Sequence, residues 1–276
     1  LGRKAGLIRQ ALALERGFEG YGFKPKRLDL SGLLGIVYRT LNPARAGTFR
    51  FGNSPQPSPS TPSGNAENDG REFIPDGRPL REQVVFGNCA VREDHLELDG
   101  LHTQVFSLTG LPGSVSPGLI NTLLERYTGD LLVTINFVNL SLADSKGALG
   151  VKRFLAGRQA KSITGQENLS AKVILEELDE VLREIESHNR RMVCFSVHAT
   201  ASTPPERRSE AADSILRAFS FVGATATVET AIALPALLSS LPLAFDPKLD
   251  SYMRRLRKVL SDRFVMFCPL WGYFRG

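Results

Sequence analysis

One pattern occurs twice between His102 and Glu229, and it is the feature that most constrains the fold. Each copy is a strand, a helix and a second strand, recognised from apolar runs in the strands and from apolar residues at helical spacing between them. The predicted elements are 103–108, 117–127 and 130–138 in the first copy, and 191–198, 205–222 and 224–230 in the second. A charged helical hairpin, 144–189, is predicted between the copies.

Two strand–helix–strand units joined in this way predict an α+β fold. We expect a ferredoxin-like, split β-α-β repeat, in which an antiparallel sheet carries helices on one face, with the helical hairpin inserted and with extra N- and C-terminal helices. A doubly wound parallel sheet is the alternative. The other predicted elements are strands 84–91 and 95–98 with a tight turn at Asp99-Gly100, helices 231–241 and 247–260, and a strand-like run 264–267.

The composition suggests three parts. Residues 1–50 are predicted to form a helical segment, in which Asp29 or Ser31 caps a helix 32–41 that ends at Asn42-Pro43. Residues 51–79 are rich in Pro, Ser and Gly and are predicted to form a flexible loop. We therefore expect the segment 1–50 to dock onto an α+β core domain, 80–276.

The composition also restricts the kind of protein. The apolar runs, such as 131–138, are far shorter than the about 20 residues that cross a bilayer, and the charged start Leu1-Gly2-Arg3-Lys4 does not fit a secretory signal. The absence of an initiating Met suggests an excised fragment. Cys89, Cys194 and Cys268 have no metal-binding spacing, so we expect buried free thiols in a reducing compartment.

The formal net charge of +5 is unevenly distributed. Basic residues cluster near both ends of the chain, whereas the region 67–99 and the helix 176–186 are acidic. Opposite patches favour self-association or docking onto charged partners or anionic lipid, and solvated helix faces are the plainer alternative. The basic residues predicted to bind a partner or a membrane surface are Lys24, Lys26, Arg27, Arg254, Arg255, Arg257 and Lys258.

No motif in the chain predicts catalysis, a cofactor or a metal. There is no phosphate-binding loop ending in Gly-Lys-Ser or Gly-Lys-Thr and no Gly-x-Ser-x-Gly elbow. None of the four histidines, His95, His102, His188 and His198, stands three to five residues from another His or from a Cys, so a zinc site is not expected. His198 at the end of a strand is expected to be structural or exposed.

A nucleic-acid-binding protein is the competing functional class, because the chain is mildly basic and a ferredoxin-like sheet can present aromatic rings to bases. The strands lack the interleaved basic and aromatic residues that such a surface needs. Phe106, Phe137 and Phe195 lie in apolar runs and are expected in the core. A hydrolase is a third possibility, but the sequence shows no set of catalytic residues that would support it.

Four stretches resemble the N-terminal domain of the conjugative-transfer and type IV secretion ATPases, the CagE/TrbE/VirB family with its TraC-like members. They are 28–43, which contains Leu41-Asn42-Pro43; 80–84; 99–112; and 241–276, which contains Arg254-Arg255 and Pro269-Leu270-Trp271-Gly272. Each motif is short, but the resemblance extends over nearly the whole chain, from residue 28 to residue 276. The Pro/Ser-rich loop 51–79 departs from the resemblance.

The resemblance implies a cytoplasmic protein that is peripheral to the bacterial inner membrane, contacts inner-membrane subunits of the secretion channel and assembles as a hexamer. In that family a RecA-like domain that binds ATP and Mg²⁺ follows, and the aromatic tail 264–274 would be the junction to it. No catalytic residue can be transferred to this chain. The expected function is therefore a non-catalytic docking and oligomerisation domain that anchors the motor, and direct nucleic-acid binding is not expected.

Overall fold

The computed structural model describes residues 2–20, 24–25, 27–47, 84–115, 117–160, 169–188 and 190–268. The predicted loop 51–79, Lys26 and the aromatic motif 269–274 lie outside these residues. No helix in the described part of the chain is long and apolar enough to cross a membrane.

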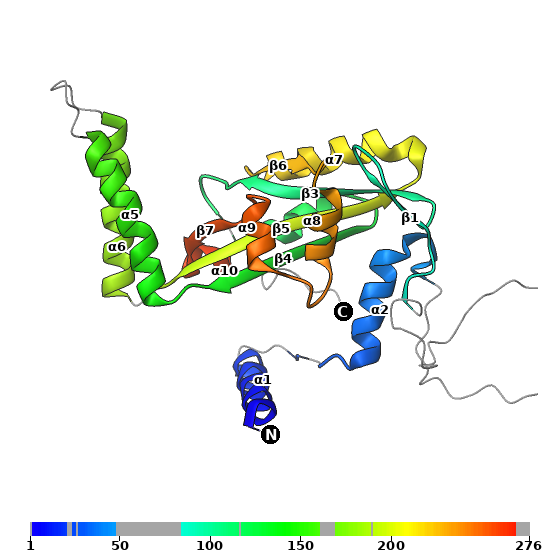
Figure 1. Cartoon of the computed structure of the whole chain (residues 1–276), viewed down its shortest axis with the longest axis horizontal. Coiled ribbons are helices and arrows are strands. Elements are labelled where there is room, and N and C mark those ends of the chain that lie inside the picture. Colours follow the sequence, from blue (N-terminus) through cyan, green and yellow to red (C-terminus); the bar gives the residue numbers. More distant parts are fainter. Residues whose placement is uncertain are drawn as a thin grey trace, which may run out of the picture.

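A seven-stranded antiparallel sheet organises the described residues (Figure 1). Its main path is β1-β2-β3-β5-β4, and β6 and β7 pair with β3 and β5 respectively. The strands are β1 (Cys89–Val91), β2 (Leu96–Leu98), β3 (Leu101–Gly110), β4 (Leu131–Asn139), β5 (Met192–Thr203), β6 (Thr225–Val228) and β7 (Arg257–Leu260).

The two predicted strand–helix–strand units interleave within this sheet. β3 and β4 come from the first unit and β5 and β6 from the second, and the pairings give the order β6-β3-β5-β4. The α+β class with an antiparallel sheet is thus confirmed. The doubly wound parallel alternative is wrong, because every strand pairing is antiparallel. The ferredoxin-like label stays a prediction, since three further strands extend the sheet.

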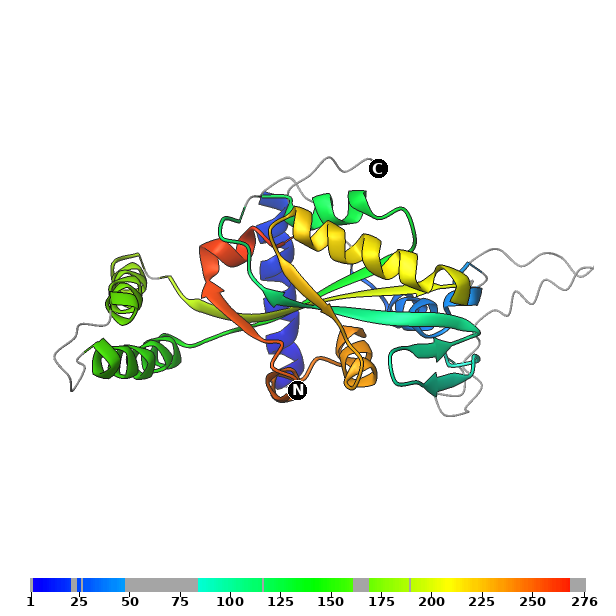
Figure 2. The same ribbon diagram turned by 90° about the horizontal axis from the view of Figure 1, so that it is seen from above.

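Helices occupy both faces of the sheet, with a two-helix arm at one end (Figure 2). Short 3₁₀ turns occur at Pro43–Arg45 and Pro205–Arg207. The α-helices are α1 (Gly2–Gly20), α2 (Leu30–Leu41), α4 (Leu119–Arg126), α5 (Leu142–Ala160), α6 (Leu169–Ser187), α7 (Arg208–Phe221), α8 (Ala233–Ser240), α9 (Pro247–Tyr252) and α10 (Ser261–Val265).

The period-two alternation of the strands explains why both faces are covered. Phe106 on β3 and Phe195 on β5 face α4 and α7 in the main core, where Leu123 and Phe219 meet them. Residues of opposite parity, such as Val105, face α8 in a second core. The prediction of helices on one face therefore holds for α4 and α7 but is wrong for α8, because the sheet is apolar enough on both sides to bury helices there.

Three predicted elements near the chain ends differ from the structure. The helix expected at 247–260 ends at Tyr252, where Arg254 takes a left-handed conformation (φ 57°) that reverses the chain. Residues 257–260 then pair with β5 as β7, and 264–267 lie at the end of α10 and the turn after it. Sheet pairing thus outweighs the helical pattern. In the predicted strand 84–91, only 89–91 are paired.

Two expectations about burial are also corrected. Phe137 is 51% exposed although its ring contacts Phe264, because β4 is an edge strand. Of the three cysteines, all of them free thiols, Cys194 is buried and Cys89 is exposed. Exposure of Cys89 follows from its place on β1, at the other edge of the sheet.

Asn42 joins the N-terminal segment to the sheet domain. Its Nδ2 group donates to Val84 O at 2.7 Å, and its Oδ1 atom accepts from Phe86 N at 2.8 Å and Gly87 N at 3.0 Å. Asp29 caps α2 by accepting from Gly32 N, as predicted. A fully buried amide therefore connects two stretches that are more than 40 residues apart in sequence.

Candidate functional site

The predicted helical hairpin is present as a two-helix arm that extends away from the sheet (Figure 1). Ion pairs join α5 to α6: Arg153 Nε lies 2.6 Å from Asp179 Oδ1, and Lys146 Nζ lies 2.9 Å from Glu186 Oε1. These contacts match the prediction of one basic and one acidic helix. Packing of the two helices against each other makes the arm a defined element rather than two independent helices.

Only the base of the arm is anchored in a core. There Leu149 and Ile185 pack with Met192 of β5 and Leu260 of β7. The outer part of the arm presents large apolar side chains to solvent, of which Phe154 is 64% exposed and Leu169 is 75% exposed. The large apolar residues exposed on the outer part of the arm are Val151, Phe154, Leu155, Leu169, Val173 and Ile174, and Leu142 is exposed at its base.

The basic residues predicted as a binding surface have different surroundings. Lys24 is exposed, and Arg27 is an exposed partner of Glu15, to which its guanidinium donates. Arg254 and Lys258 are exposed as well. Lys26 lies outside the described residues. Of the N-terminal basic residues in the predicted surface, the structure therefore describes Lys24 and Arg27.

The side chain of Arg255 is half-buried and forms an ion pair within the fold. Its guanidinium binds the carboxylate of Glu229, which is 2% exposed; the Nη2–Oε2 distance is 2.8 Å, and Nε donates to Oε1. This pairing raises the pKa of Arg255. Arg257 is half-buried on β7, where burial and then the charge of Arg255 lower its pKa. Neither side chain is as accessible as those of Arg254 and Lys258.

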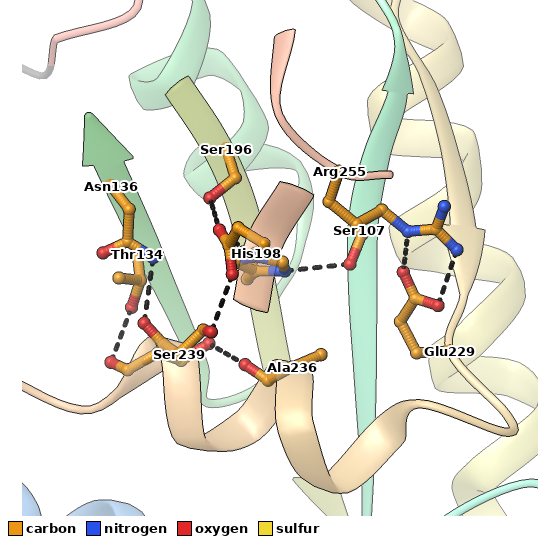
Figure 3. Close-up of polar contacts among 11 residues, drawn as sticks. Ser107, Thr134, Asn136, Ser196, His198, Glu229, Ala236, Ser239 and Arg255 are labelled. Atoms are coloured by element: carbon orange, nitrogen blue, oxygen red, sulfur yellow. Dashed lines mark hydrogen bonds and ion pairs between the residues drawn. The ribbon is translucent and has the colours of Figure 1, made fainter. Parts of the chain in front are cut away.

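A polar cluster lies in the interior between β5 and the helices α8 and α9 (Figure 3). Asp250 accepts from Ser239 Oγ at 2.7 Å and from Ser196 Oγ, and His198 Nε2 lies 3.5 Å from Asp250 Oδ2. On its other side, His198 Nδ1 is 2.8 Å from Ser107 Oγ. These five side chains come from strands β3 and β5 and from helices α8 and α9.

The hydrogen-bond donors around Asp250 favour the ionised form of its carboxyl group. Burial by itself raises the pKa of its carboxyl, but the hydrogen bonds from His198, Ser196 and Ser239 more than offset this effect, so that the pKa is lowered overall. Two side chains of β4 add to the cluster by binding the last carbonyls of α8: Asn136 Nδ2 donates to Ser239 O at 2.9 Å, and Thr134 Oγ1 donates to Ser240 O at 3.1 Å. The cluster thus anchors α8 and α9 to the sheet.

Serine, histidine and aspartate in contact are the groups of a hydrolytic triad, but the burial here opposes that role. Ser107, His198 and Asp250 have no accessible surface, so a substrate could not reach them without opening the core. Catalytic groups must contact the reacting atoms. The cluster is therefore assigned a structural role. Of the two alternatives expected for His198, structural or exposed, its burial excludes the exposed one.

Two hollows in the described surface are lined by other residues. One, of about 380 Å³, lies between the segment 111–115 and residues of β7 and α10. The second, of about 290 Å³, lies between residues 127–130 and the start of α7. Neither is lined by a histidine or a cysteine, so neither supplies a nucleophile next to an imidazole base.

One group of described residues has the composition of a metal site. His95, Glu97 and His102 each offer a ligand atom, and these atoms lie within 4.8 Å of one another. Histidine spacing along the chain does not reveal this group, because its members are brought together by strand pairing. The useful signal was the tight-turn dipeptide Asp99-Gly100, which places His102 opposite Glu97 in a hairpin.

Comparisons with protein-family models and with curated proteins found no match to this chain. The fold class thus rests on the structure, and the likeness to the transfer ATPases remains a resemblance between short sequence motifs.

Proposed function

We propose that this chain is a non-catalytic docking domain and that the arm formed by α5 and α6 makes the contact with a neighbouring protein. The observation that carries this proposal is the number of large apolar side chains that both helices of the outer arm expose beyond the packed base. Contiguous exposed apolar surface is typical of protein interaction sites. Burying it would contribute about 25 cal/mol per Å² of apolar area.

The arrangement of charges favours a protein partner over a lipid surface for the arm. Arg153 and Lys146 are paired with acidic residues of α6, so the arm is not a uniformly basic surface. A partner would cover Phe154 and Leu155 on α5 and Ile174 on α6, and would leave the ion pairs at its rim.

We further propose that the parent protein is a conjugative-transfer ATPase of type IV secretion. The support is the sequence resemblance, together with a fold that presents a projecting arm and no accessible catalytic constellation in its described residues. The partners would be inner-membrane subunits of the channel and other copies of this chain in a hexamer. The domain would lie in the cytoplasm, peripheral to the inner membrane, and ATP and Mg²⁺ would bind in a domain outside these 276 residues.

The test is binding of the purified chain to inner-membrane subunits of a type IV secretion channel, and its self-association measured by sedimentation velocity. Phe154→Asp and Ile174→Asp should each weaken the association about tenfold or more, because a charge replaces a buried apolar contact. Glu177→Ala, at an exposed polar position of α6, is the matched control.

Thermal unfolding should show that both arm variants remain folded, since the side chains they replace are exposed. Association that is unchanged by both aspartate variants would overturn the role of the arm. Turnover of ATP by the isolated chain would contradict the non-catalytic assignment. If the chain associates with itself but binds no channel subunit, only the proposed role in type IV secretion is contradicted.

A further inference from the structure

The β2–β3 hairpin brings three metal-binding side chains to one face of the sheet. Asp99 and Gly100 have positive φ values of 51° and 82°, the conformation of a two-residue hairpin turn, and this fixes the register. Glu97 and His102 are therefore direct cross-strand partners. His95 is two residues before Glu97 and shares its face, because side chains alternate along an extended chain.

Two ring nitrogens in this group are buried and have no partner. They are Nε2 of His95, a residue only 8% exposed, and Nδ1 of His102. The two imidazole rings lie against each other, with centroids 4.1 Å apart, and His95 Nε2 is 3.9 Å from Glu97 Oε1. Buried polar atoms without a partner are costly, and a cation that accepts their lone pairs would remove that cost.

Neighbouring groups contact two of the three side chains, His95 and Glu97. His95 Nδ1 lies 2.6 Å from Asp94 Oδ1 and 3.0 Å from Arg208 Nη1. In the tautomer that donates Nδ1–H to the carboxylate, the lone pair is on Nε2, where a metal ion would bind. A carboxylate on the far nitrogen is the usual support of a metal-bound histidine. Arg208 of α7 holds the other Asp94 oxygen at 2.9 Å, and Arg92 orients Glu97 through two hydrogen bonds of 2.8 and 3.0 Å.

We propose that His95, Glu97 and His102 bind a divalent transition-metal ion with the ligand preferences of Zn²⁺. Two imidazoles and one carboxylate suit such an ion and do not suit Mg²⁺ or Ca²⁺, which favour oxygen ligands. Three protein ligands leave a fourth position for water or for a group of a partner.

Binding draws the three ligands together. Zn–N and Zn–O bonds are about 2.0–2.2 Å, so the ligand atoms of a tetrahedral site lie about 3.3 Å apart. The present separations, of up to 4.8 Å, close by rotation of Glu97 and of the His102 ring. The guanidinium groups of Arg92 and Arg208 stay near the ion and reduce its affinity, so the site binds with moderate strength. The bound ion joins β2 to β3 within the hairpin.

The experiment is titration of the purified chain with Zn²⁺ by calorimetry, and with Co²⁺ by visible absorption, which reports coordination geometry. A Cys89→Ser background removes the exposed thiol of β1 as a competing ligand. Saturable uptake of one ion per chain, with d–d absorption bands for Co²⁺ and a rise of the unfolding temperature in excess Zn²⁺, is the expected result.

Two variants assign the ligands. Glu97→Gln keeps the shape of the side chain, and His102→Asn removes one imidazole; each should weaken Zn²⁺ binding about tenfold or more. His188→Asn is the matched control, because His188 is an exposed histidine at the end of α6. The proposal is overturned if the Cys89→Ser chain takes up no metal, or if Glu97→Gln, which preserves folding, binds Zn²⁺ and Co²⁺ as tightly as the unaltered site.

Discussion

Arg255 and Glu229 form a two-point ion pair that ties the segment after α9 to the end of β6. The backbone N–H of Glu229 also donates to Val105 O at 2.8 Å, so the carboxylate is fixed from its own main chain. Arg255 belongs to the basic stretch 254–258, which the sequence predicted to be a binding surface. The pair that it forms with Glu229 is largely buried. Its two residues are 26 positions apart.

Replacing Arg255 by Ala should destabilise the fold by about 3 kcal/mol, because Glu229 would remain buried without its partner. Arg254→Ala is the matched control, since Arg254 is exposed, and it should change stability by less than about 0.5 kcal/mol. Denaturant unfolding of both variants measures the difference. Equal stability of the two would mean that the ion pair contributes little to folding.

Asp250 should make the stability of the fold dependent on acid pH. Its pKa is lowered in the folded state relative to the unfolded value of about 3.9, so its contribution is present above that value. This contribution is lost as pH falls through the folded-state pKa, when the carboxylate that accepts from Ser196, Ser239 and His198 is protonated. Stability should therefore decline below about pH 4.

The Asp250→Asn variant isolates this effect. It should be less stable than the unaltered chain at neutral pH and should lose less stability on acidification, as measured by urea unfolding at a series of pH values. Asp213→Asn, at an exposed position of α7, should retain the acid-dependent loss. A parallel decline in the unaltered chain and in Asp250→Asn would assign the acid sensitivity to other groups.

Asn42 should be essential for docking of the N-terminal segment. Asn42→Ala removes side-chain hydrogen bonds to Tyr38 O, Val84 O and the N–H groups of Phe86 and Gly87, at a cost of about 2–4 kcal/mol. Limited proteolysis should then cleave near α2 at lower protease concentrations. Asn88→Ala, at an exposed position nearby, should behave like the unaltered chain; similar cleavage of both variants would show that other contacts hold α2.

The exposed part of the basic patch should bind anionic lipid weakly and electrostatically. Arg254→Glu and Lys258→Glu should each reduce binding to phosphatidylserine-containing vesicles about fivefold or more, because one cation near such a surface contributes about 1 kcal/mol. Arg217→Glu, on α7, is the control. Vesicle sedimentation at rising salt checks this, and binding that is insensitive to salt would exclude the electrostatic mechanism.

Local patterns were enough to predict many of the elements. The alternation in 191–198 and the helical spacing in 205–222 predicted β5 and α7, although β5 continues to Thr203 and α7 begins only after a 3₁₀ turn. The turn signal Asp99-Gly100 predicted the hairpin correctly. A spacing of three to five residues between histidines, in contrast, does not identify His95 and His102 as neighbours. They are brought together across a hairpin, so they are further apart along the chain than that spacing allows.

The sequence by itself determined the elements whose periodicity is strong, the order of the two repeated units, and the charged two-helix arm, because backbone geometry couples side-chain spacing directly to helix or strand. Only the tertiary structure determined that residues 257–260 form β7 and that α8 covers the second face of the sheet. It also determined that Arg255 is half-buried in an ion pair whereas Arg254 is exposed. Those outcomes depend on pairing and burial between distant segments, and the free energies involved exceed the small local preferences that a sequence pattern reports.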